Sequence, residues 1–242
     1  MEVHKYLVMC LALLCGRAAF AATSTYTATG TSSGGQTENA LATFVTGNGT
    51  VGVTLNDLIS NPRNIGQNIS GLFFTLSNGA TIGSMTSSGI ELRVNSSGTY
   101  SIGSPVSTGW VLTSSGGSLL LEVLNTPEAP KHTIIGPSSN GSYSGGAYSK
   151  ANASIAGNHT HNPFLESGVT FSLTISGVTA TTTVTNATFL FGTATGNRLA
   201  AITPVPEADV TMLVLLGASL AGLSCGIGRF RKAKQSRSKP GN

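Results

Sequence analysis

The chain has 242 residues, of which 40% are hydrophobic but only 9% are charged, far fewer than the roughly 25% usual in soluble proteins. Its formal net charge of +4 comes from the ends, because residues 23–203 carry five basic and six acidic side chains. No basic folded face is therefore expected, and a nucleic-acid partner is excluded. The three cysteines (Cys10, Cys15 and Cys225) lie in apolar end segments, so the body has no disulfide chemistry.

The N-terminal residues have the pattern of a secretory signal. Lys5 precedes an apolar run, Tyr6–Gly16, and Ala19-Phe20-Ala21 follows with small residues at the first and third positions. The apolar run is shorter than the about 20 residues that a membrane-spanning helix needs. We predict a signal peptide over residues 1–21, with Ala19 and Ala21 guiding cleavage after Ala21.

The central part of the chain predicts an all-β ectodomain. Residues 22–40 are rich in Ser, Thr and Gly and are expected to form a mobile lead-in. From residue 41 to 200, short alternating runs such as Val169–Ile175 are separated by turn pairs such as Asn78-Gly79. This spacing is typical of an antiparallel β-sandwich or barrel-like ectodomain. Residues 136–163 predict a long polar connection, which is the first place to look for binding.

The C-terminal residues combine three adjacent features. Thr203–Ala208 holds two prolines, Val210–Gly228 contains no charge, and six basic residues lie between 229 and 239. At about 1.5 Å per residue, a helix over 210–228 would be about 28 Å long, close to the thickness of a bilayer's hydrocarbon core. Basic residues beside a span stay in the cytoplasm. The residues expected to set this orientation, with the body outside, are Arg229, Arg231, Lys232 and Lys234.

The order of motif, span and basic tail over residues 203–239 resembles the PEP-CTERM sorting signal of Gram-negative bacteria. The motif residues are Val205, Pro206 and Glu207, followed by Ala208 where the usual signal has a second proline. The resemblance implies that an exosortase, an integral membrane transpeptidase-like enzyme, processes the chain. It also implies a bacterium that makes exopolysaccharide.

The body offers few residues for chemistry, and no catalytic residue or cofactor is predicted. His159 and His161 are weak metal candidates, because residues i and i+2 of a strand face the same side and could share a metal with His132 or Glu166. The lone tryptophan, Trp110, is expected in the core, with sugar stacking as the alternative. Four glutamates are expected to be isolated surface acids: Glu91, Glu122, Glu128 and Glu166.

These features predict a surface or extracellular-matrix protein, structural or adhesive, without enzymatic activity. Its expected partners are the exosortase, the membrane and exopolysaccharide. Two alternatives stay open, a carbohydrate-binding module and a secreted metal-dependent hydrolase that uses His159 and His161.

Overall fold

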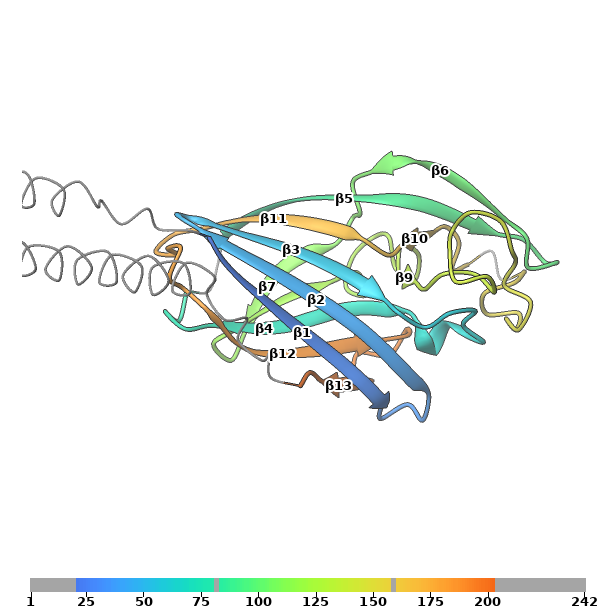
Figure 1. Ribbon diagram of the computed structural model, residues 1–242, viewed down its shortest axis with the longest axis horizontal. Coiled ribbons are helices and arrows are strands. Elements are labelled where there is room, and N and C mark those ends of the chain that lie inside the picture. The colour runs from blue at the N-terminus through green and yellow to red at the C-terminus, as the bar shows by residue number, and fades with distance from the viewer. Residues whose placement is uncertain (1–20, 81–82, 158–159, 203–242) are drawn as a thin grey trace, which may run out of the picture. The chain divides into compact units, whose positions relative to one another are not determined.

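The computed structural model describes residues 21–80, 83–157 and 160–202, all within one compact unit, Met1–Pro204. This part of the chain is all-β, as predicted, with one short 3₁₀ helix, η1 (Ile65–Gln67). The strands, shown in Figure 1, are β1 (Ala22–Thr31), β2 (Thr37–Gly47), β3 (Thr50–Asp57), β4 (Ile69–Leu76), β5 (Gly83–Val94), β6 (Tyr100–Val106), β7 (Val111–Ser115), β8 (Ser118–Glu122), β9 (Ile134–Ile135), β10 (Phe164–Glu166), β11 (Val169–Ile175), β12 (Val184–Phe191) and β13 (Arg198–Ala200).

The strands form one large, mostly antiparallel sheet. Its order is β1-β2-β3-β11-β5-β10-β9-β4-β12-β13, with β6 added to β5, β8 added to β4, and β7 added to β8. The β9–β10 pair is parallel, and the other ladders are antiparallel. An isolated bridge between Thr27 and Ile202 brings the two ends of this order together, with the Ile202 N–H donating to the Thr27 carbonyl at 2.8 Å.

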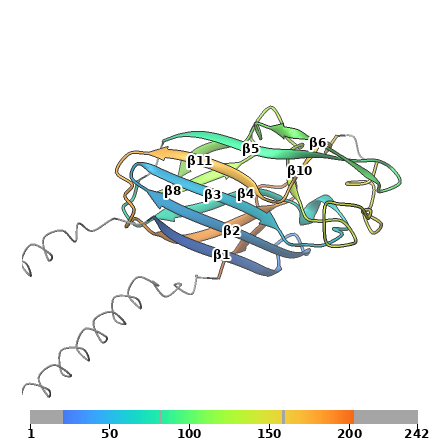
Figure 2. The same ribbon diagram turned by 45° about the horizontal axis from the view of Figure 1, so that its top comes forward.

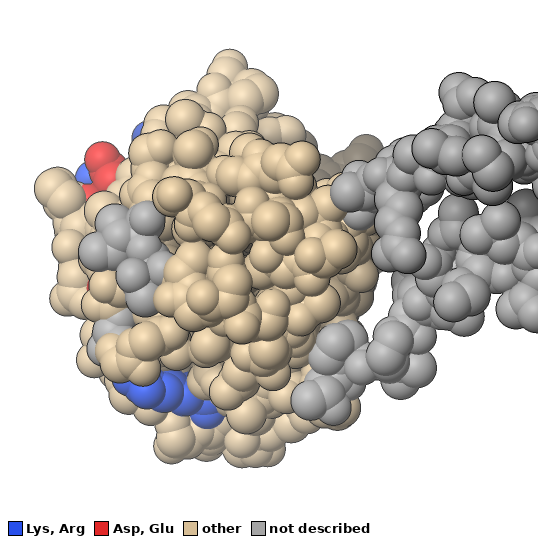
Figure 3. Space-filling view, turned by 90° about the vertical axis from the view of Figure 1, so that its left-hand side faces the viewer, with Lys and Arg blue, Asp and Glu red and all other residues tan. Residues whose placement is uncertain are grey.

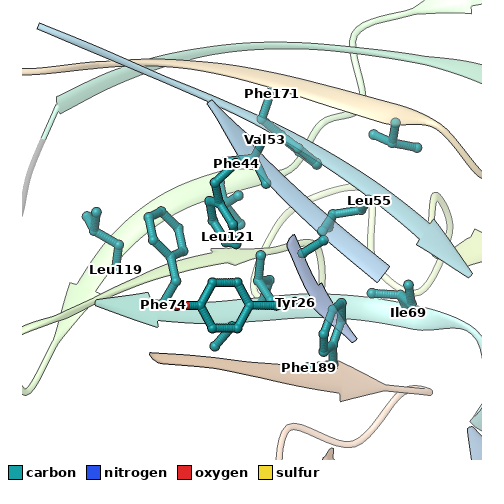
Figure 4. Packing of buried hydrophobic residues seen from close by; sticks show 14 of the residues in the cluster. Tyr26, Phe44, Val53, Leu55, Ile69, Phe74, Leu119, Leu121, Phe171 and Phe189 are labelled. Carbon is teal, nitrogen blue, oxygen red and sulfur yellow. The ribbon is translucent and has the colours of Figure 1, made fainter. Parts of the chain in front are cut away.

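The two halves of the sheet lie over a common hydrophobic core. Strands β1, β2, β3, β11 and β5 lie on one side, and β4 and β12 lie on the other (Figure 2). Figure 4 shows the inward side chains of both halves, with Phe44 and Phe171 facing Phe74 and Phe189. The rings of Phe44 and Phe74 have centroids 5.2 Å apart, so aromatic contacts join the two halves directly.

The predicted alternation is confirmed in the strands that line the core. Along β11, buried and exposed residues alternate without interruption, with Phe171 and Leu173 inside and Thr170 and Ser172 outside. The predicted turn at Asn78-Gly79 directly follows β4, where the Gly79 N–H donates to the Leu76 carbonyl at 3.0 Å and Gly79 has a φ of 68°, which favours glycine. Period-2 patterning therefore determined which face of these strands is buried.

The expected mobile lead-in over residues 22–40 is wrong. Residues 22–31 form β1, which pairs with β2 over its full length, so these residues belong to the folded body, which does not start at residue 41. Tyr26 and Ala28 point into the core, and the Tyr26 hydroxyl donates to the Val184 carbonyl. Composition misled here, because threonine is β-branched and suits a strand as well as a linker.

The predicted long connection is confirmed, since no strand lies between β9 and β10 among its described residues. It is packed against the sheet through Tyr148 and Ile155, which join a second buried cluster. The Tyr148 hydroxyl donates to the Gly136 carbonyl at 2.9 Å, and its backbone N–H donates to Gly98 at 2.8 Å. These bonds satisfy backbone carbonyls that a buried loop would otherwise leave without partners.

Across the described ranges, no helix is both long enough and apolar enough to cross a membrane. The predicted span over 210–228 lies outside those ranges. So does the predicted signal peptide, apart from Ala21, which is exposed.

Trp110 is confirmed as a core residue, with 4% of its surface exposed. Its ring packs 5.2 Å from Phe171, and its indole N–H donates to the His132 carbonyl at 2.9 Å. The sugar-stacking alternative for Trp110 is wrong, because a buried ring offers no face to a ligand.

Replacing Trp110 with Ala should lower the free energy of unfolding by about 3–5 kcal/mol, because it removes a large buried ring from a packed core. Urea unfolding followed by circular dichroism would measure this change. The matched control is Val45→Thr on the exposed face of β2, which should change stability by less than about 0.5 kcal/mol. Equal effects of the two substitutions would contradict the packing described here.

Candidate functional site

An open groove lies on the outer side of β4, β8 and β12. Its volume is about 290 Å³, and it is lined by Phe73, Phe74, Thr75, Ser118, Asn186, Thr188 and Arg198. The lining combines one aromatic surface with hydroxyl, amide and guanidinium groups. Such a mixture of apolar contact and a few polar groups is typical of small-ligand sites.

Strand alternation explains why an aromatic residue faces outward here. On β4, Leu72, Phe74 and Leu76 point into the core, so Phe73 and Thr75 point to the other side. The register of β4 with β12 places Thr188 opposite Phe73 and Asn186 opposite Thr75. Four side chains of the groove therefore come from two neighbouring strands.

Arg198 reaches the groove from β13. Its guanidinium carbon lies 4.6 Å from the centre of the Phe73 ring, in a cation–π contact. The pairing of Arg198 with Leu190 on β12 sets this position. The stacked guanidinium is exposed to solvent, so its N–H groups can meet a ligand.

The remaining polar groups of the groove are hydrogen-bond partners suited to a neutral or anionic ligand. Thr75 and Ser118 share a hydrogen bond of 2.9 Å between their hydroxyls. No side-chain hydrogen bond of Asn186 or Thr188 occurs among the described residues, so both can serve a ligand. No acid, histidine or cysteine belongs to the described lining. The arrangement can bind, and it offers no acid–base pair for catalysis.

A second hollow of about 290 Å³ lies beside β5 and β6, where Arg93, Tyr100 and Asn162 are among its lining residues. The guanidinium of Arg93 lies 3.9 Å from the Glu91 carboxylate. Its charge is therefore partly matched within the chain, unlike that of Arg198.

Two buried carboxyl groups lie at one end of the core, and sequence reasoning missed them. Glu38 on β2 and Asp57 on β3 are both 0% exposed. Both occupy inward positions of their strands, with Glu38 two residues before Ala40 and Asp57 two residues after Leu55. Extending the alternation of these strands toward their ends would have found both residues.

Each carboxyl has one bonded and one unbonded oxygen. Glu38 Oε1 accepts from the Ser32 hydroxyl at 2.9 Å, and Asp57 Oδ1 accepts from the Ile59 N–H at 2.9 Å. Glu38 Oε2 and Asp57 Oδ2 have no hydrogen-bond partner in the described structure. Burial raises the pKa of Glu38 to about 7, with the Ser32 bond opposing the shift. Burial, and to a lesser extent the charge of Glu38, also raise the pKa of Asp57 well above its usual value.

His132 forms a separate buried network with Glu91. Its Nδ1 lies 2.8 Å from the Thr108 carbonyl, and its Nε2 lies 3.1 Å from a Glu91 oxygen. A carbonyl can only accept, so Nδ1 is the donor of the first of these bonds. The backbone of His132 has a φ of 55°, a conformation that few non-glycine residues adopt. The network ties the β9 side of the sheet to β5 and is structural.

The metal hypothesis gains no support from the described residues. They contain no group of three or more His, Cys, Asp or Glu side chains placed to hold an ion. His161 Nδ1 lies 2.9 Å from the Ser154 carbonyl, whereas His159 lies outside the described residues. His132 is bonded to Thr108 and Glu91 instead of joining His161.

The prediction of isolated surface acids is wrong for three of the four glutamates, because Glu91 is paired with Arg93 and His132 and the other two are buried. Glu122 and Glu166 are buried, with 4% and 9% of their surfaces exposed. Glu122 accepts from the Asn125 amide at 2.8 Å. Glu166 on β10 has one oxygen without a partner in the described structure, and burial raises its pKa. Both glutamates are the last residue of a short strand whose other residues are mostly buried, β8 for Glu122 and β10 for Glu166.

The predicted sorting and targeting residues lie outside the described structure. They are Ala19, Val205, Pro206, Glu207, Ala208, Arg229, Arg231, Lys232 and Lys234. The groove residues, by contrast, were not predicted. The available signal was Phe73, an aromatic residue at an outward position of an otherwise regular strand pattern. The contribution of Arg198 came only from tertiary pairing.

Comparison with known proteins gave no match. No family model, curated protein or solved structure matches this chain.

The buried carboxyls predict that stability falls as pH rises. Because their pKa values are raised in the folded state, the folded chain keeps protons that the unfolded chain releases above about pH 4.5. For Glu38, the loss should accumulate between pH 4.5 and about 7. Glu38→Gln, which mimics the protonated acid, should reduce this slope and stabilise the protein at pH 8 relative to the unsubstituted chain.

The measurement is the free energy of unfolding in urea at pH 5, 6, 7 and 8. Glu128→Gln, at a partly exposed acid, is the control and should leave the slope unchanged. A stability that is flat from pH 5 to 8, or identical slopes for Glu38→Gln and the unsubstituted chain, would refute the assignment.

Proposed function

We propose that the protein is an exported surface or extracellular-matrix protein, structural or adhesive, which is anchored and then processed at a C-terminal PEP-CTERM signal. The observation that carries the proposal is the order of three sequence features over residues 203–239. A proline-containing motif precedes a span-length apolar segment, which precedes a basic cluster. Any one of these features is common, but their order and adjacency are specific.

The physical basis of processing is an extended strip beside the bilayer. Pro204 and Pro206 lack backbone donors and disfavour helix in the residues before them. A membrane enzyme can grip such a strip. In the proposal, Val205–Ala208 is recognised, 210–228 spans the inner membrane, and the basic residues from Arg229 onward stay in the cytoplasm.

The surface of the body supports a structural or adhesive role. The outward positions of β1, β2, β3 and β11 carry no charged side chain. One cross-strand row of hydroxyls runs through five paired strands: Thr25, Thr43, Thr54, Thr170 and Ser88. Figure 3 shows one face of the molecule, where charged atoms are few. We further infer a sandwich-like ectodomain, supported by the two facing halves of the sheet and the Thr27–Ile202 bridge.

A carbohydrate-binding module remains the second candidate. The groove around Phe73 and Arg198 favours it, because the groove combines an aromatic surface with free amide and hydroxyl groups. Trp110, the residue first considered for this role, is buried and takes no part.

Expression in a bacterium that has an exosortase should release a form without the apolar segment 210–228. Mass spectrometry of the released protein would locate its new C-terminus near Pro206–Glu207. Replacing Pro206 and Glu207 with Gly and Ala should keep the chain in the membrane fraction. An exosortase-deficient strain is the matched control, and an intact C-terminus on all mature protein would count against processing.

A reporter fused after Asn242 should be active in the cytoplasm, because the basic residues that follow the span stay on that side. Alkaline phosphatase and green fluorescent protein fusions, which are active on opposite sides of the inner membrane, would measure this. Substituting Arg229, Arg231, Lys232 and Lys234 with Gln should weaken the preference of the C-terminus for the cytoplasmic side. A reporter found in the periplasm of the unsubstituted protein would overturn the proposed topology.

A further inference from the structure

Arg198 carries a positive charge that nothing in the described structure neutralises. The described ion pairs both involve Glu91, with Arg93 and with His132. The one hydrogen bond from the Arg198 side chain among these residues is long, from Nε to the Thr195 carbonyl at 3.5 Å. The other N–H groups of the guanidinium are therefore available.

The Phe73 ring holds this guanidinium at the groove. The 4.6 Å separation between the guanidinium carbon and the ring centre fits a cation–π contact, which restricts the motion of the long side chain. A planar, preorganised guanidinium is the group best suited to bind a carboxylate through two parallel hydrogen bonds. An arginine free in solvent would lose more side-chain entropy on binding.

The groups around Arg198 suit a polyhydroxylated ring. The Asn186 amide can both donate and accept, and so can the hydroxyls of Thr188, Thr75 and Ser118. The uncovered part of Phe73 offers apolar contact. The described lining contains no carboxylate that would repel an anion.

We propose that this groove binds a uronic-acid residue of an acidic polysaccharide. Arg198 takes the carboxylate, and Asn186 and Thr188 take neighbouring hydroxyls. The second hollow is a poorer candidate, because Glu91 lies 3.9 Å from its Arg93 and competes for that charge.

The test uses the purified full-length chain in a neutral detergent, with binding measured by isothermal titration calorimetry. The probes are oligogalacturonate, the same oligomer with methyl-esterified carboxyls, and poly-glutamate of equal charge. Oligogalacturonate should bind at least tenfold more tightly than either of the others. Equal binding of the esterified oligomer would show that the carboxylate is not recognised. Equal binding of poly-glutamate would show that the sugar ring is not recognised. Either result would overturn the proposal.

Substitutions of Arg198 and of a control arginine then test whether the oligomer binds in the groove. Arg198→Gln should weaken oligogalacturonate binding at least tenfold, and Arg198→Lys should recover only part of it, because a lysine cannot bind a carboxylate in bidentate fashion. Arg63→Gln removes an exposed charge that does not line the groove and should change affinity by less than twofold. Thermal unfolding would confirm that each variant is folded.

Equal losses in Arg198→Gln and Arg63→Gln would show general attraction of a polyanion and overturn the proposal, as would no binding by the folded parent chain. The assay uses purified protein, so its result is independent of whether the chain is exported or processed.

Discussion

The structure depends on burying the hydrophobic inward face of one continuous sheet away from water. The strand order begins with β1 and ends with β13, and the two ends meet at the Thr27–Ile202 bridge. Tyr26 reinforces this contact, since its ring packs against Phe44 at 5.7 Å and its hydroxyl bonds Val184 on β12. The Phe44 ring in turn packs against Phe74 at 5.2 Å, so a row of aromatic contacts leads from β1 to β4.

The same requirement makes the carboxyls of Glu38 and Asp57 costly. A charged carboxylate without a full set of partners is unfavourable in a dry core, so the folded state favours the neutral acid. The two groups occupy terminal inward positions of β2 and β3, and Asp57 lies beside Gly136, where the long connection begins. Stability and pH are therefore coupled at one end of the core.

The side chains on the outer face of the sheet are selected differently from those in the core, because they are in contact with water and with any ligand. The outward positions of β11 all carry hydroxyls, and residues 23–203 have only eleven charged side chains. Against this background the Phe73–Arg198 pair is unusual, since it joins an aromatic ring and an unpaired cation at one open groove. The alternation that directs Phe74 into the core also directs Phe73 to this groove.

The sequence by itself determined the all-β class, the inward faces of strands such as β11, the turn at Asn78-Gly79 and the long connection before β10. These features depend on local periodicity and turn chemistry, which a linear pattern contains. Composition hid β1, because a Thr-rich strand resembles a linker until a partner strand is known. The tertiary structure alone decided which strands pair across large separations, that Glu38 and Asp57 share one buried end, and that Arg198 lies over Phe73. Each of these depends on contacts between residues far apart in the chain, and local pattern carries no information about that pairing.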